Sequence, residues 1–98
     1  MVLGFHIPLF DHVYRVEDRA RLFKLLEQVQ HPLIVSGHTH NQSQKFWGAA
    51  DGWNGAKPLH EYNVGAACGA FWSGVKDAQG IPDTTMADGT PHGYGLLN

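Results

Sequence analysis

The amino-acid sequence predicts an α/β fold built around one strand–helix–strand unit. Three segments carry the prediction: a short apolar run at Val2–Phe5, a helical pattern over Arg19–Val29, and a β-branched run at Leu33–Ser36. Two strands at this spacing are typically parallel neighbours joined by a right-handed helical crossover. The length of 98 residues allows one domain at most.

The helix is predicted to begin near Val16. Glu17 and Asp18 fall in its first turn, where their negative charge complements the helix dipole. Apolar side chains then recur at helical spacing, which predicts an amphipathic helix with one face on the core. These side chains are Leu22, Phe23, Leu25, Leu26 and Val29. His31-Pro32 is expected to end the helix, with His31 in its last turn.

The second predicted strand is a continuous apolar run, whereas the rest of the chain alternates short predicted strands with long loops. Leu33–Ser36 is a continuous run, typical of a strand buried on both faces. Beyond it, further strands are expected at Gln42–Trp47, His60–Cys68 and His92–Leu97. Glycine-rich and proline-containing loops are expected at 48–58, 69–80 and 81–91. Cys68 is predicted to be a packing residue within its strand.

Composition and charge exclude several functional classes. Charged residues make up 16% of the chain, the net charge is −2, and the seven basic residues are scattered rather than clustered. This distribution argues against a surface for nucleic acid or an anionic membrane. No apolar run approaches the roughly 20 residues of a membrane span. With Cys68 as the single cysteine, no intrachain disulfide can form, and the cellular compartment is left open.

Two histidine segments lie where the predicted parallel strands end. His6 follows the first strand, and Gly37-His38-Thr39-His40 follows the second. Because ligands collect at the carboxyl ends of parallel strands, three imidazoles are expected at one edge of the sheet. Gly37 is expected to supply the backbone freedom for a sharp exit from the strand. Alternate residues point opposite ways, so His38 and His40 are better placed to serve two neighbouring metal ions, one each.

The spacing alone leaves a second interpretation open. With seven histidines in 98 residues, about 0.5 His-x-His pairs are expected by chance, so the motif depends on its place after the strands. Histidines at strand ends also commonly hydrogen-bond backbone carbonyls without binding metal.

The motif order resembles that of the calcineurin-like metallophosphoesterases. His6-Ile7-Pro8 after a strand, and Ser36-Gly37-His38-Thr39-His40 after an apolar strand, are similar to the last two metal-binding motifs of that family. Three downstream segments look like one bacterial branch, in which the catalytic domain continues into a C-terminal β domain. These segments are Tyr62–Gly69, Phe71–Gly74 and Asp88–Tyr94.

The resemblance implies a fold, an activity and a ligand set. The chain would form part of a two-sheet, helix-flanked sandwich, with residues 1–60 in the catalytic domain and 61–98 forming closing strands and the start of the C-terminal region. His6 and His38 would bind one ion and His40 the other, in a centre of two Mn, Fe or Zn ions that activates water against a phosphoester substrate. Imidazole suits these ions, and two neighbouring ions can lower the pKa of a bridging water and clamp phosphate oxygens.

The sequence departs from the family pattern upstream of His6. The family's Asp-x-His, Gly-Asp and Gly-Asn-His motifs, which would supply the remaining ligands and the catalytic histidine, do not precede it. The chain is therefore expected to be a fragment that needs the N-terminal half of the domain and is inactive alone. The alternative is a non-catalytic module whose tryptophan- and glycine-rich half binds a carbohydrate or a protein, with structural histidines.

Overall fold

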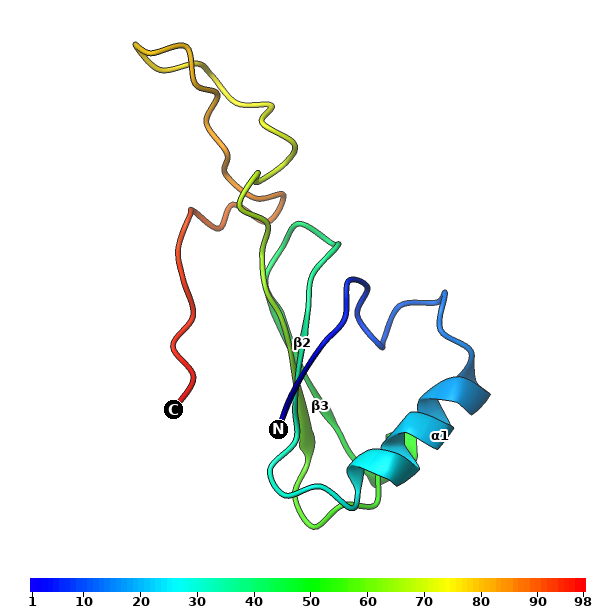
Figure 1. Ribbon diagram of the computed structural model, residues 1–98. Coiled ribbons are helices and arrows are strands. Elements are labelled where there is room, and N and C mark those ends of the chain that lie inside the picture. Colours follow the sequence, from blue (N-terminus) through cyan, green and yellow to red (C-terminus); the bar gives the residue numbers. More distant parts are fainter.

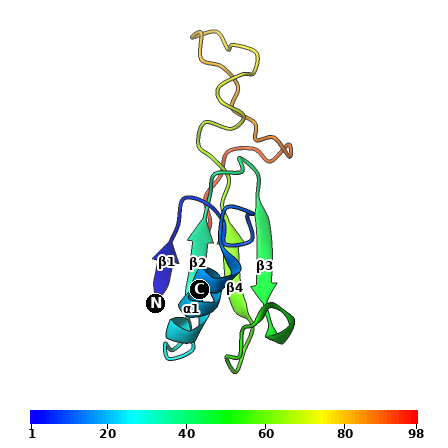
Figure 2. The ribbon, with the colours of Figure 1, turned by 90° about the vertical axis from the view of Figure 1, so that its right-hand side faces the viewer.

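A computed structural model describes residues 1–98 and places the predicted strand–helix–strand unit in a four-stranded mixed sheet (Figures 1 and 2). The elements in chain order are β1 (Val2–Gly4), α1 (Val16–Leu26), β2 (Leu33–Ser36), β3 (Ser43–Trp47), the short 3-10 helix η1 (Ala49–Asp51) and β4 (Leu59–Asn63). The strand order in the sheet is β1-β2-β4-β3. The fold is α/β, compatible with part of a metallophosphoesterase domain.

The first two strands are parallel neighbours, as predicted. Leu3 pairs with Ile34 in the β1–β2 ladder, and Ile34 pairs in turn with Glu61 in the parallel β2–β4 ladder. β3 and β4 are antiparallel, with Trp47 opposite Leu59. β4 is therefore a central strand, and its side chains meet those of β2 and β3.

The helix begins at Val16 as predicted but ends at Leu26, before Val29. Pro32 disfavours helical geometry at the residue before it, and His31 adopts a left-handed conformation (φ 49°). His31 consequently lies in the turn after the helix, and its placement in the last helical turn was wrong. Leu25 is 66% exposed, because it lies two residues from the buried Phe23 and so on the opposite side of a 3.6-residue turn.

The core lies between α1 and one face of the sheet. The ring of Phe23 packs edge-on against Trp47 and Trp53, with centroids 5.4 and 5.7 Å away. Leu9, Leu26, Ile34 and Leu59 complete this cluster. Trp47 and Trp53 are thus packing residues, whereas Trp72 is 52% exposed.

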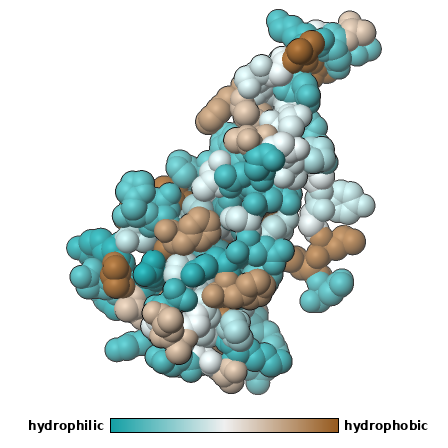
Figure 3. Space-filling view, turned by 180° about the vertical axis from the view of Figure 1, so that it is seen from behind, coloured by the Kyte–Doolittle hydropathy of each residue, from teal (hydrophilic) through white to brown (hydrophobic).

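The other face of the sheet has no helix over it. Ile34 and Ser36 are buried, but Leu33 and Val35 are half-buried, so burial of β2 on both faces was wrong. Figure 2 shows α1 on a single side of the sheet. Seen from behind, hydrophobic side chains are interspersed with hydrophilic ones (Figure 3).

Beyond β4 the chain forms an arm (residues 64–98) that extends away from the sheet and then turns back, so that its last residues run beside the sheet (Figure 1). The strand expected at His60–Cys68 ends at Asn63, which leaves Cys68 half-buried in a turn instead of packed in a strand. The arm contains one isolated β-bridge, between Lys76 and Pro82, and further backbone hydrogen bonds such as that from the Ala70 amide to the Thr85 carbonyl. The strand expected at 92–97 does not form, because these residues make no backbone hydrogen bonds to a neighbouring strand. No helix combines the length and apolar character needed to cross a membrane.

Candidate metal-binding site

The two histidine segments meet at the carboxyl edge of β1 and β2. The backbone pairing of these strands continues past their ends, since the Phe5 amide donates to the Val35 carbonyl at 2.9 Å and the Gly37 amide donates to the His6 carbonyl at 3.1 Å. In Figure 2 both loops leave the same end of the sheet. The parallel register of β1 and β2 therefore brings His6 beside the loop that follows Gly37.

His6 and His38 face each other directly. The Nε2 atom of His6 lies 3.1 Å from Nδ1 of His38, and the rings cross at 74° with centroids 4.9 Å apart. Both residues are exposed. The distance suits one N–H···N hydrogen bond between neutral rings. It also suits two nitrogens on one ion, because imidazole binds Zn²⁺ at about 2.0–2.1 Å and two such bonds at near-tetrahedral angles place the nitrogens ~3.3 Å apart.

His40 points away from this pair, toward the arm. Its Nδ1 atom lies 2.5 Å from the Gly69 carbonyl oxygen, and its ring stacks on Phe71 with centroids 4.1 Å apart. The Cys68 sulfur is 3.9 Å from the same nitrogen. A carbonyl oxygen only accepts, so Nδ1 carries the proton and Nε2 is the nitrogen left with a lone pair.

The three predicted ligands thus divide into a pair and a single residue. His6 and His38 come together, and His40 diverges, in the manner expected for alternate residues. No group of three His, Cys, Asp or Glu side chains converges closely enough to hold a metal ion. The assignment of the three histidines as ligands stays a prediction.

The sharp exit from β2 is made by histidines instead of by Gly37. His38 and His40 both have left-handed backbones, with φ of 72° and 55°, while Gly37 has no positive φ. A left-handed conformation costs a residue with a Cβ atom roughly 1–2 kcal/mol, so the surrounding contacts must hold it in place.

A buried carboxylate that the sequence analysis did not identify lies below the two loops. Glu61 is fully buried on β4. Its Oε1 accepts hydrogen bonds from the Leu9 amide (2.8 Å) and the Ser36 hydroxyl (2.9 Å), and its Oε2 accepts one from Nε1 of Trp47 (2.9 Å). It therefore joins β4 to the loop after His6, to the end of β2 and to β3.

A buried amide on the same face of β4 contacts the second histidine loop. Asn63 is also fully buried, and its Nδ2 donates to Oγ1 of Thr39 (2.5 Å) and to the backbone oxygen of Asn41 (3.0 Å). The sequence signal that could have identified both residues is the alternation of side chains along a strand. Leu59, Glu61 and Asn63 occupy one face of β4, so two polar side chains share the buried face with Leu59.

Hydrogen bonds from the arm secure the other side of this loop. The Ala87 amide donates to the His40 carbonyl at 3.0 Å, and the Gln42 amide donates to the Asp88 carboxylate at 2.8 Å. The backbone amides of Gln42 and Thr90 hold the pKa of Asp88 below its usual range, because they stabilise the ionised form. The segment from His40 to Gln42 is thus fixed from both β4 and the arm.

The loop after His6 contains one perturbed phenol. The Tyr14 hydroxyl donates to the Ile7 carbonyl at 3.1 Å. Burial, followed by the negative charges of Glu61 and Asp11, raises the pKa of Tyr14 above its ordinary value.

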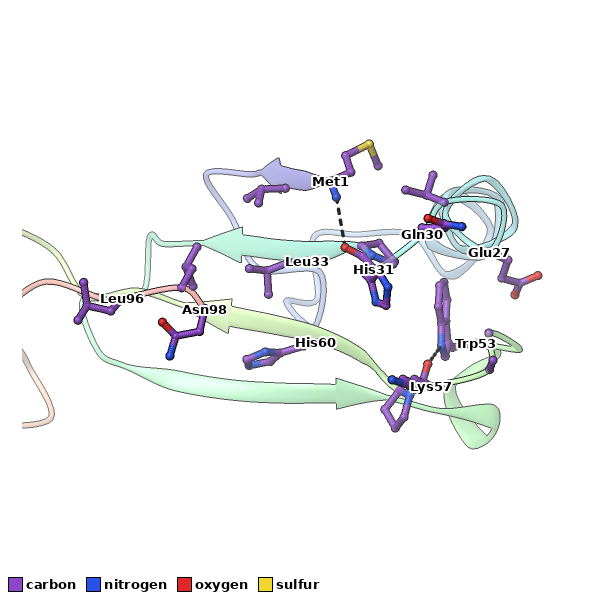
Figure 4. Close-up of a pocket in the computed structure, with 17 residues that line it drawn as sticks. Met1, Glu27, Gln30, His31, Leu33, Trp53, Lys57, His60, Leu96 and Asn98 are labelled. Carbon is purple, nitrogen blue, oxygen red and sulfur yellow. Dashed lines mark hydrogen bonds between the residues drawn. The ribbon is translucent and has the colours of Figure 1, made fainter.

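A cavity of about 830 Å³ lies elsewhere, at the amino ends of the parallel strands (Figure 4). Its lining includes Met1, His31, Trp53, His60 and Asn98, and none of the three predicted ligands. Two hydrogen bonds drawn there tie the Met1 amino group to the His31 carbonyl and Trp53 to the Lys57 carbonyl. The cavity is therefore separate from the histidine edge.

Comparison with known proteins adds one finding. Residues 61–98 match the family model described as the C terminal of calcineurin-like phosphoesterase. No curated protein and no solved structure matched the chain. The matched segment includes Glu61 and Asn63 and the whole of the arm, and it agrees with the resemblance found in the histidine motifs. This match covers 38 of the 98 residues and supports a fragment of a calcineurin-like metallophosphoesterase, with the matched residues in the C-terminal region of that family.

Proposed function

We propose that this chain supplies three imidazole ligands to the binuclear metal centre of a phosphoester hydrolase, with His6 and His38 on one ion and His40 on the other. The observation that carries the proposal is the 3.1 Å approach of His6 Nε2 and His38 Nδ1 at the carboxyl edge of two parallel strands. The family match in residues 61–98 supports the phosphoesterase class.

The donor set fits a divalent or transition-metal centre of Mn, Fe or Zn, for which neutral imidazole is a common ligand. Two such ions would lower the pKa of a bound water and neutralise charge on a phosphoryl group. Within this chain, the hydrogen bond from His40 to the Gly69 carbonyl selects the tautomer that leaves Nε2 free. His6 and His38 are both exposed residues, so the pair lies at the surface of the chain.

Two converging imidazoles do not complete a coordination sphere. A catalytic site of this kind uses at least three protein ligands per Zn²⁺ ion. The isolated chain is therefore proposed to bind metal weakly and to have no useful hydrolytic rate, with the remaining ligands and the catalytic histidine contributed by the N-terminal half of the domain. Phosphomonoesters, phosphodiesters and nucleotides are equally compatible substrates.

The alternative, a carbohydrate- or protein-binding module, has less support. A stacking surface for a sugar needs exposed aromatic rings, and Trp47 and Trp53 are buried against Phe23. Only Trp72 among the tryptophans is substantially exposed.

Calorimetric titration of the chain with Zn²⁺ at neutral pH tests the proposal. Binding should be measurable in the parent chain, and His38→Ala should weaken it by about tenfold or more because only His6 would then face the ion. His40→Ala should remove or weaken a second, separate binding event. His12→Ala is the matched control, since the His12 side chain is 93% exposed and contacts only Asp11. Equal binding by all four proteins would refute the ligand assignment.

A further inference from the structure

We infer that Asn63 is a positioning residue for the candidate metal site: its buried amide sets the backbone geometry of the loop that presents His38 and His40. The inference rests on the proposed function only for its consequence in metal affinity. The positioning itself is a claim about the loop, and it can be tested without metal.

The Asn63 side chain contacts the loop at two points that flank His40. Its Nδ2 donates to Oγ1 of Thr39, the residue between the two histidines, at 2.5 Å, and to the backbone oxygen of Asn41 at 3.0 Å. The Asn41 carbonyl can only accept, so the nitrogen of the amide must face the loop. The Thr39 hydroxyl in turn donates a hydrogen bond to Oδ1 of Asn41 at 2.6 Å. Asn63, Thr39 and Asn41 thus form a closed set of hydrogen bonds.

The loop needs such a restraint because both histidines adopt unfavourable backbones. His38 and His40 have φ of 72° and 55°, a region that residues with a Cβ atom leave unless the structure around them holds it. The His38 ring cannot hold it, since His38 is exposed and its ring contacts only the equally exposed His6. The His40 ring is held from the side of the arm, by the Gly69 carbonyl and Phe71. The buried contacts of Asn63 lie between the two left-handed residues and directly after them.

Asn63 is itself rigidly placed. It is fully buried at the end of β4, where it pairs with Ser36 in the parallel β2 ladder and with Ser43 in the antiparallel β3 ladder. The Val64 amide, next along the chain, donates to the Ser36 carbonyl at 2.7 Å. Two residues earlier on the same face, Glu61 binds the Ser36 hydroxyl. Because the Asn63 side chain is fixed relative to the sheet, its hydrogen bonds fix the loop relative to the sheet as well.

The test compares Asn63→Asp with matched controls. Aspartate keeps the size of the side chain but removes both N–H donors and sets an acceptor against the Asn41 carbonyl. Asn54→Asp is the chemical control, because Asn54 is exposed and contacts only the surface around Gly52 and Glu27. Ile34→Val is the stability control, because it trims a fully buried core side chain of β2 that makes none of the side-chain hydrogen bonds to the histidine loops.

Two measurements separate positioning from general stability. The first is the nuclear Overhauser effect between the His6 and His38 rings in metal-free protein. We expect it to be strong in the parent chain and in both controls, and to be lost in Asn63→Asp. The second is Zn²⁺ affinity by calorimetry, which should fall about 10- to 100-fold in Asn63→Asp, the range for partners that orient metal ligands, and should be unchanged in Ile34→Val.

Each outcome decides between the two claims. A parent chain that shows the ring contact but binds no Zn²⁺ would refute the proposed function and leave the ring contact as the test of positioning. Retention of the ring contact in Asn63→Asp would overturn the positioning role. If Asn63→Asp fails to fold, Thr39→Val removes one of the two loop contacts with little change in shape. Weakened ring contact in that folded variant supports the inference, and an unchanged contact overturns it.

Discussion

The hydrogen bond between Trp47 and Glu61 should make the stability effects of changing these two residues strongly non-additive. Glu61→Gln keeps the shape of the side chain and one acceptor oxygen, which can still bind the Leu9 amide and the Ser36 hydroxyl. The new amide nitrogen then lies where Oε2 was, 2.9 Å from Nε1 of Trp47. Two donors would face each other in a site with no water-exposed alternative, since Glu61 is fully buried and Trp47 is 2% exposed.

The magnitude follows from the type of bond that is lost. A hydrogen bond to a charged group contributes about 1.5–3 kcal/mol, and a buried donor left without a partner costs about 1–3 kcal/mol. Replacing a carboxylate by a neutral amide lowers the cost of desolvating this buried group and acts in the opposite direction, so Glu61→Gln is expected to destabilise the protein by about 1–3 kcal/mol. In a Trp47→Phe background the opposing N–H is absent, and the same change should be close to neutral.

Urea unfolding of the four proteins in this double-mutant cycle measures the coupling directly. We expect a coupling free energy of about 1–3 kcal/mol between positions 47 and 61, the difference between the effects of Glu61→Gln in the two backgrounds. Glu17→Gln, at an exposed position in the first turn of α1, is the control and should change stability by no more than about 0.5 kcal/mol. If Glu61→Gln lowered stability equally in both backgrounds, the account of this buried network would be refuted.

Two further predictions concern the loop after β1 and the arm. The raised pKa of Tyr14 means that folding favours its neutral phenol. This residue therefore contributes stability that is complete below its unfolded pKa and is lost as pH rises through the higher folded pKa. The difference in urea stability between the parent chain and Tyr14→Phe should change across the alkaline range above pH 10.0, and a difference that does not vary with pH there would contradict the prediction. Gly69→Ala should loosen the arm, because Gly69 has a φ of 51° and an added Cβ would lie 1.6 Å from the Thr84 carbonyl oxygen. Limited proteolysis should cleave the arm faster in this variant than in the control Gly93→Ala, where an added Cβ meets nothing within 4 Å. Equal cleavage rates would argue against this close packing.

The parts of the fold that depend on local pattern and chain connectivity could be predicted from sequence. Strand, helix and strand at short spacing predicted parallel neighbours, and the β1–β2 ladder has that arrangement. Parallel strands end at the same edge of a sheet, so the meeting of His6 and His38 followed from their position after the two strands. Burial of Trp47 and Trp53 agrees with the usual role of large aromatic side chains in cores.

The tertiary structure alone decided what lies beneath and beside those histidines. Sequence spacing does not specify that β4 inserts between β2 and β3, yet this strand order places Glu61 below the loop after His6 and Asn63 below the loop of His38. His40 turns toward Gly69, 29 residues along the chain, because the arm returns over that edge. Local periodicity contains no information about such distant partners, whereas the register of the central strand determines them.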